Sequence, residues 1–196
     1  MFGKVAGGEA ARFAKSVPAG ETKVLLKQAS ATQQRTEQLV NRSDGSERIA
    51  TLRTEMAQSM EDGCGIYRLA DSMQATCDKL DELRQRFKNV DVEDKSRVWN
   101  SNWLAAIELG YQLEVAQVMV HSAINRKESR GAHQRLDGFE ARDDANYLKH
   151  TLAYYNGDAA PRIAYGPVKI TKSQPGVRAY GAAGEKAEHD RKPADH

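Results

Sequence analysis

Apolar residues recur at helical spacing through the central part of the chain and predict two amphipathic helices there. The first helix is expected over residues 46–62, with one apolar stripe made of Ile49, Leu52, Met56 and Met60. The second is expected over residues 71–88, with a stripe made of Met73, Cys77, Leu80, Leu83 and Phe87. Asp71 or Ser72 can cap the first amides of this second helix, because their side chains accept hydrogen bonds from free backbone N–H groups.

The longest predicted helix covers residues 101–127 and is apolar over most of its circumference. One of its stripes consists of Leu104, Ile107, Tyr111, Val115 and Val118, and the other of Leu109, Leu113, Ala116, Val120 and Ala123. A helix of this kind is expected to be surrounded by other elements. The two preceding helices are the nearest candidates, so the sequence predicts a mainly α fold centred on a three-helix (spectrin-repeat-like) bundle.

The segments that flank this bundle follow other patterns. The expected elements are a short helix over 2–15, a weaker helix over 25–40, and extended chain at 149–155, 162–165 and 168–170. The extended segments alternate in strand fashion around the turn at Asn156-Gly157-Asp158, so they predict a small C-terminal β-hairpin extension. From Gly181 onward the chain has no hydrophobic pattern, and we expect a disordered tail.

Composition excludes several classes of protein. The chain has 29 Lys and Arg against 27 Asp and Glu, and a net charge of +2 is not that of a nucleic-acid binder. Cys64 and Cys77 lack metal-site spacing, so we expect two reduced thiols of a cytosolic protein. No segment has the apolar run of a membrane span or a secretory signal. Nucleotide-binding and nucleophile motifs are also missing, so we expect no catalytic, cofactor-binding or metal residue in this chain.

One charged segment, from Arg126 to Arg142, stands out. Its arginines suit a carboxylate ligand and His133 can donate a proton, which together indicate an anion site. A structural role competes with this interpretation. Arg126 and Lys127 complement the negative end of the long helix, Gly131 suits a turn, and four acidic residues are near enough to pair with the arginines: Glu128, Asp137, Asp143 and Asp144. The residues alone leave both interpretations open.

Several motifs resemble the C-terminal region of the succinate dehydrogenase/fumarate reductase flavoproteins. The most specific is RKESRGAHQRLD at 126–137, followed by RDD at 142–144 and NYLKHTL at 146–152. Upstream, DGCGIYR at 62–68 and IELG at 107–110 are more similar to the fumarate reductase branch. The resemblance covers nearly the whole chain. It implies a helical bundle with a β extension, in agreement with the periodicity.

The resemblance also implies how the chain is organised and what precedes it. Residues 1–45 are expected to be a remnant of the flavin-domain junction and a linker, 46–131 the helical bundle, 132–180 a loop and β extension, and 181–196 the tail. The flavin-binding and capping domains, with FAD and the family's catalytic residues, would all precede Met1. This chain alone is therefore expected to be an inactive fragment or isolated domain that binds no cofactor.

In the intact complex, the resemblance implies an oxidoreductase that uses quinol to reduce fumarate to succinate. The expected partners are the flavin-binding and capping domains of the same subunit and the iron–sulfur subunit. Partner subunits would hold the complex on the cytoplasmic face of the bacterial inner membrane. Candidates for ion pairs across the domain boundary are Arg126, Glu128, Arg130, His133 and Arg135.

Two other functions fit the same residues. The chain can be a stand-alone helical module that binds an acidic partner through Arg126–Arg142. A small anion-binding enzyme with His133 as general acid is the third hypothesis.

Overall fold

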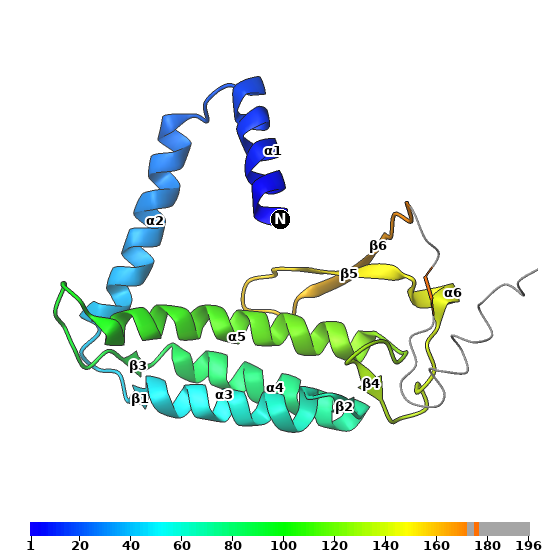
Figure 1. Cartoon of the computed structure of the whole chain (residues 1–196). Helices are drawn as coiled ribbons and strands as arrows, with labels where there is room; N and C mark the ends of the chain where they lie inside the picture. Colours follow the sequence, from blue (N-terminus) through cyan, green and yellow to red (C-terminus); the bar gives the residue numbers. More distant parts are fainter. Residues whose placement is uncertain (172–174, 177–196) are drawn as a thin grey trace, which may run out of the picture.

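Three antiparallel helices form the body of the protein, as a computed structural model that describes residues 1–171 and 175–176 shows (Figure 1). They are α3 (Ile49–Cys64), α4 (Ala70–Phe87) and α5 (Ser101–Asn125). Each observed helix lies within three residues of the range that periodicity predicts. The three-helix bundle is therefore confirmed. None of the helices among the described residues combines the length and the apolarity needed to cross a membrane.

The core of the bundle is built from the predicted stripes of all three helices. Side chains with no measurable exposure include Leu52, Met73, Leu80, Leu83, Leu109 and Val120. α3 and α4 approach closely at Gly63, where an added Cβ would lie 2.0 Å from Thr76 Oγ1. Only glycine fits at this crossing, because any larger residue would push the two helices apart.

The prediction that α5 is surrounded on all sides is correct for one of its stripes only. Leu109, Leu113 and Val120 are buried, whereas Leu104 and Val115 on the other stripe are each 56% exposed. α3 and α4 cover one side of α5, and α2 and the hairpin contact it as well, so the second stripe is covered only in part. A contiguous apolar surface of this kind is typical of a contact with another domain or protein.

Two short parallel strand pairs hold the ends of the bundle, and periodicity did not predict them. At one end β1 (Glu47–Arg48) pairs with β3 (Val90–Asp91). At the other end β2 (Tyr67–Arg68) pairs with β4 (Gln134–Arg135), which connects the α3–α4 turn to the chain that follows α5. Strands of two residues show no alternation, so no pattern in the sequence indicates them.

The C-terminal extension is an antiparallel hairpin of β5 (Lys149–Tyr154) and β6 (Arg162–Pro167), preceded by the one-turn helix α6 (Asp144–Tyr147). The predicted hairpin is confirmed, but the expected extended segment at 168–170 is not part of a strand. β5 and β6 both contact α5, so the hairpin leans on the bundle. The tail expected at 181–196 lies outside the described residues.

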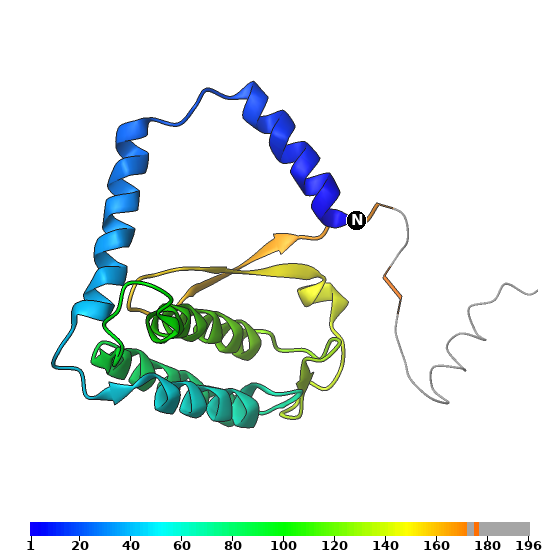
Figure 2. The same cartoon turned by 60° about the vertical axis from the view of Figure 1, so that its left-hand side comes forward.

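Two helices, α1 (Phe2–Ser16) and α2 (Thr22–Asn41), form an arm that extends away from the bundle, with only the C-terminal part of α2 in contact with α5 (Figures 1 and 2). α1 has no buried residue, and Val40 is the only one in α2. The arm nevertheless carries large apolar side chains, such as Phe2 at 90% and Phe13 at 67% exposure. An amphipathic helix with nothing against its apolar face lacks the packing that normally stabilises it.

The loop between β3 and α5 presents an aromatic side chain in a strained backbone conformation. Trp99 is 97% exposed and has a φ of 56°, the only positive φ at a non-glycine residue in the part of the chain that the structure describes. Asn100 fixes the loop, because its Nδ2 donates to the carbonyl oxygens of Asp94 and Ser96 at 2.6 and 2.8 Å. Asn100 Oδ1 also caps α5 by accepting from the Trp103 N–H at 2.7 Å.

We predict that Trp99→Gly stabilises the isolated chain by about 1 kcal/mol, because glycine adopts positive φ without steric cost. The exposed indole makes no packing contribution that would oppose this gain. Urea denaturation of the variant and wild type measures it. The matched control is Val98→Gly, which relieves no strain and should lower the free energy of unfolding by about 0.5 kcal/mol. A lower urea midpoint for Trp99→Gly than for wild type would contradict the prediction.

Candidate functional site

The conspicuous charged segment folds into a cluster around the buried carboxylate of Glu128. This side chain has 0% exposure and lies just beyond the C-terminus of α5. Arg126 Nε donates to Glu128 Oε1 at 2.8 Å, and Arg130 donates through Nε and Nη2 to both oxygens at 2.8 and 2.9 Å. The backbone N–H of Asp143 donates to Oε2 at 2.8 Å. All these donors come from the same chain.

These hydrogen bonds decide the charge state of Glu128. Burial by itself would raise the pKa of Glu128, because a charged carboxylate loses its hydration. Hydrogen bonds from Arg130, the Asp143 N–H and Arg126 outweigh burial, so the pKa lies below the ordinary value for glutamate. The side chain is therefore ionised at neutral pH, and the cluster is a network of buried ion pairs.

Arg135 is the second buried charge, with 2% exposure, and it joins two helix ends. Its Nη1 donates to the carbonyl oxygens of Ile124 and Arg126, both at 3.2 Å, at the C-terminal end of α5. Its Nε and Nη2 donate to the carboxylate of Asp137 at 2.8 and 2.6 Å. Asp137 Oδ2 also accepts from the Ala70 N–H at 2.7 Å, at the N-terminus of α4.

The predicted cap of α4 is therefore corrected. Neither Asp71 nor Ser72 makes a capping hydrogen bond to α4, since that role belongs to Asp137 from a distant segment. At the end of α5, Arg135 donates to two carbonyl oxygens, in addition to the positive charges of Arg126 and Lys127 that were expected there. Sequence reasoning considers neighbours of a helix end along the chain, whereas these caps arrive through the β2–β4 pairing.

His133 bridges the same helix end to β2. Its Nε2–H donates to the Arg126 carbonyl oxygen at 2.9 Å, and its Nδ1 accepts from Arg68 Nη1 at 2.7 Å. Burial lowers the pKa of His133, and the nearby guanidinium groups of Arg68 and Arg135 lower it further. The hydrogen bond to the Arg126 carbonyl oxygen raises the pKa, but by less than these effects lower it. A neutral imidazole with both nitrogens engaged has no proton to give at neutral pH, so the geometry argues against His133 as a general acid.

The remaining parts of the cluster connect it to the hairpin. Gly131 supplies the predicted turn with a φ of 60°, and the Arg130 and His133 backbones pair across it. Arg130 Nη2 donates to Asp144 Oδ1 at 2.6 Å. Arg126 donates to the carbonyl oxygen of Tyr147 and to Thr151 Oγ1, at 2.8 Å for the latter, in α6 and β5. The cluster is thus a rigid joint between the bundle and its β extension.

All five candidate interface residues take part in this joint. The structure brings Arg126, Glu128, Arg130, His133 and Arg135 together and pairs each within the chain. Among the salt-bridged candidates, Arg130 keeps the most exposure, at 27%, against 15% for Arg126, 2% for Arg135 and 0% for Glu128. The acidic pairing partners Glu128, Asp137 and Asp144 were predicted, whereas Arg68 was missed because it lies 65 residues away from His133.

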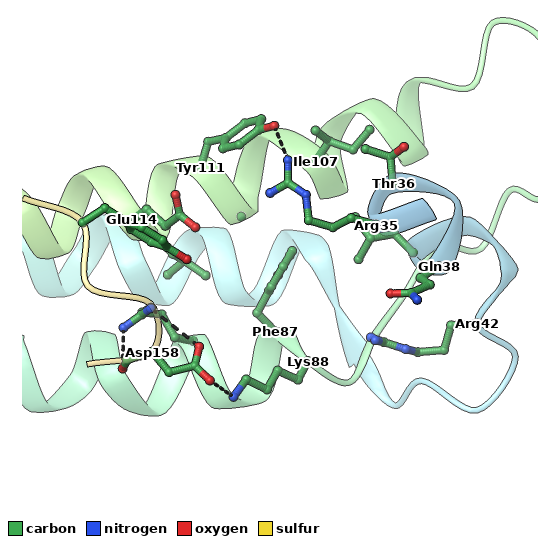
Figure 3. A pocket seen from close by; sticks show the side chains of 15 residues that line it. Arg35, Thr36, Gln38, Arg42, Phe87, Lys88, Ile107, Tyr111, Glu114 and Asp158 are labelled. Atoms are coloured by element: carbon green, nitrogen blue, oxygen red, sulfur yellow. Dashed lines mark hydrogen bonds and ion pairs between the residues drawn. The ribbon is translucent and has the colours of Figure 1, made fainter. Parts of the chain in front are cut away.

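A cavity of about 300 Å³ lies between α2, α4, α5 and the hairpin turn (Figure 3). Its polar side chains are largely occupied: Arg35 Nη2 donates to Tyr111 Oη at 2.7 Å, and Lys88 Nζ donates to Asp158 Oδ2 at 3.0 Å. Across residues 1–171 and 175–176, no three His, Cys, Asp or Glu side chains gather as a metal site requires.

Comparison with known proteins defines the class to which this fold and joint belong. The family described as "Fumarate reductase flavoprotein C-term" matches residues 53–180. The fumarate reductase flavoprotein subunit of Proteus vulgaris is 52% identical over 92% of this chain, and that of Escherichia coli is 49% identical over 96%. The chain belongs to this C-terminal family of the fumarate reductase flavoprotein subunits. It spans 30% and 31% of the length of these two relatives.

Solved structures agree with this assignment. A structure titled "E. coli Quinol fumarate reductase FrdA E245Q mutation" superposes with a TM-score of 0.85 at 50% identity, covering 91% of this chain and 31% of that one. Adenylylsulfate reductase of Archaeoglobus fulgidus, at 15% identity and a TM-score of 0.66, covers 88% of this chain and 29% of that one, and shares the fold alone. The resemblance read from the sequence motifs is confirmed.

Proposed function

We propose that this chain is the C-terminal scaffold of a flavoprotein that reduces fumarate with electrons from quinol. In the intact protein, FAD and the reacting substrate would be held by the part of the relatives' length that this chain does not span. An iron–sulfur subunit would deliver the electrons, and partner subunits would hold the complex on the cytoplasmic face of the membrane. The family match and about 50% identity to fumarate reductase flavoprotein subunits support this proposal.

One structural observation carries the scaffolding role: large apolar side chains are exposed on the arm and on α5. Phe2, Phe13, Leu104 and Val115 are each more than half exposed. An isolated soluble domain buries such side chains, because each removes apolar surface from water on burial. The flavin-binding portion would cover these surfaces, and the joint around Glu128 would keep bundle and hairpin in a fixed relation beneath it. If an ion pair also crosses that boundary, Arg130 is the best placed of the five candidates.

A fusion protein tests the proposal. This chain would replace the corresponding C-terminal residues of the Proteus vulgaris subunit, and the purified fusion would be assayed for bound FAD and for fumarate-dependent oxidation of a reduced viologen dye. We expect both to be retained. The same fusion carrying Leu80→Asp, a charge at a side chain with 0% exposure, should lose both because the bundle cannot form. Loss of FAD and turnover in the fusion with the wild-type chain would refute the scaffold role.

A further inference from the structure

A shallow cavity of about 440 Å³ lies on the outer side of the joint, between the end of α5, the loop that follows it, α6 and the hairpin. Figure 1 shows these elements meeting at one end of the bundle. Two lysines and three aromatic residues contribute most of its lining: Lys127, Lys149, Phe139, Tyr147 and Tyr165. We call these five residues the lysine–aromatic patch. Neither the joint nor the proposed scaffold role uses the ammonium groups of this patch.

The two lysines carry positive charge that no carboxylate pairs with. Four nearby arginines have a carboxylate partner: Arg126 and Arg130 pair with Glu128, Arg135 with Asp137, and Arg142 with Asp144. Arg68 instead donates to His133 and to the Gly65 carbonyl oxygen. Among the described residues, no hydrogen bond or ion pair engages Nζ of Lys127 or Lys149. An incoming anion therefore meets the lysines rather than the arginines. A site for an acidic partner, expected at Arg126–Arg142, would therefore be formed by Lys127 and Lys149 rather than by the arginines.

Aromatic rings hold both ammonium groups beside the cavity. Lys149 Nζ lies 4.8 Å from the ring centroid of Tyr165, and Lys127 Nζ lies 5.9 Å from that of Phe139. Tyr147 and Tyr165 contact edge to face, with centroids 6.0 Å apart, and Tyr165 Oη donates to the Asn125 carbonyl oxygen at 3.0 Å. Cation–π contacts orient an ammonium without neutralising it, so the charges remain available to a carboxylate.

The one carboxylate in the cavity is already engaged. Asp143 caps α6 by accepting from the Asn146 backbone N–H at 3.0 Å and from its Nδ2 at 2.8 Å. Its charge is turned toward the helix end, which leaves the two lysines as the principal ligands for a bound anion. The rest of the lining is Asn146 and the three aromatic side chains, and aromatic side chains favour apolar or aromatic neighbours of that anion.

We propose that the lysine–aromatic patch binds an extended acidic segment of a partner protein, with a carboxylate between Lys127 and Lys149 and an apolar side chain on the rings. A membrane surface fits less well, because recognition of anionic lipid needs a cluster of about four to eight basic residues. Nucleic acid fits less well because the patch lacks a basic stripe that could follow a phosphate backbone. The proposal is independent of the redox role, since it concerns a surface outside any reaction centre.

Fluorescence anisotropy with the full 196-residue chain tests the proposal. The probe is a labelled ten-residue peptide of alternating Glu and Tyr. Its comparisons are the Gln–Tyr counterpart, phosphatidylglycerol vesicles and inorganic phosphate. We expect the acidic peptide to bind best and its affinity to fall several-fold between low and 0.5 M salt. The double variant Lys127→Gln/Lys149→Gln should weaken binding about tenfold, as expected for the loss of two ion pairs.

The matched control is Lys27→Gln, which removes one charge from the exposed face of α2 and should leave binding unchanged. Circular dichroism establishes that the variants keep their helices. Equal binding of the acidic peptide by wild type and the double variant would overturn the proposal. So would stronger binding of vesicles or phosphate than of the peptide, or no binding of the peptide at all. None of these results bears on the fusion experiment, which reports FAD and turnover.

Discussion

Glu128→Gln is expected to lower the free energy of unfolding of this chain by about 3–5 kcal/mol, the typical cost of breaking a buried ion pair by removing one partner. The glutamine keeps the shape of the side chain but removes the buried charge that the partly buried guanidinium groups of Arg126 and Arg130 pair with. Its amide N–H₂ would also replace one of the two acceptor oxygens that Arg126, Arg130 and the Asp143 N–H now share. Urea denaturation at neutral pH, followed by far-UV circular dichroism, measures the loss.

Glu61→Gln is the matched control, because Glu61 lies exposed on α3 and the same chemical change there should shift stability by no more than about 0.5 kcal/mol. Equal urea midpoints for Glu128→Gln and Glu61→Gln would show that the buried network contributes nothing specific.

The lowered pKa of Glu128 also predicts how the stability of the chain depends on pH. The pKa of Glu128 lies below its ordinary value of 4.5, so its contribution to stability is complete above that pH. The contribution disappears as the pH falls through the lowered pKa, because the unfolded chain binds the proton more readily. Wild type should therefore lose more stability than Glu128→Gln on acidification below 4.5. Parallel stability curves for the two proteins would contradict this account.

Arg135→Met is expected to destabilise the chain by a similar amount, about 3 kcal/mol or more. Methionine fills much of the space but removes the donor to the Ile124 carbonyl oxygen, leaves the Arg126 carbonyl oxygen with His133 alone, and leaves Asp137 without its counter-ion. Because Asp137 also caps α4, the loss should spread from the end of α5 to the start of α4. Hydrogen exchange of the Ala70 amide, together with urea denaturation, reports both effects.

A second substitution separates these causes. In Arg135→Met/Asp137→Asn, the unpaired charge is removed while the α4 cap keeps an acceptor, so part of the lost stability should return. The control Arg12→Met, on the exposed helix α1, should change stability little, because its ion pair with Glu9 is solvent-exposed. If Arg135→Met were as mild as Arg12→Met, the capping role assigned to Arg135 would be wrong.

The local hydrophobic pattern was sufficient to predict the helices that span several helical turns and the strands that contain several apolar–polar alternations. The stripes through Leu52, Leu80 and Leu113 are buried as expected, and the hairpin occurs where alternation predicts it. The two-residue strands and the caps from Asp137 and Arg135 were not predicted. Each depends on segments that only the completed fold brings together, and no local signal identifies such partners.

The open stripe of α5 was misread for a different physical reason. Periodicity correctly marks Leu104 and Val115 as positions that favour burial, but it does not say which element buries them. α3 and α4 cover one side of α5, while α2 and the hairpin contact it as well and leave these two side chains more than half exposed. Of the four acidic residues expected to be close enough to pair with the arginines, Glu128, Asp137 and Asp144 do so, whereas the Asp143 carboxylate caps α6. The buried arginine of the charged cluster was not foreseen, because burial of a charge depends on partners that are distant in sequence.

The account rests on the claim that this chain is a scaffold without redox chemistry of its own. Its most direct test is to purify the 196-residue chain, incubate it with FAD, remove unbound flavin and record the absorbance spectrum, followed by an assay for fumarate-dependent dye oxidation. The account predicts a colourless protein with no flavin absorbance and no turnover. A flavin spectrum that remains with the protein, or any fumarate reduction above the buffer control, would contradict it.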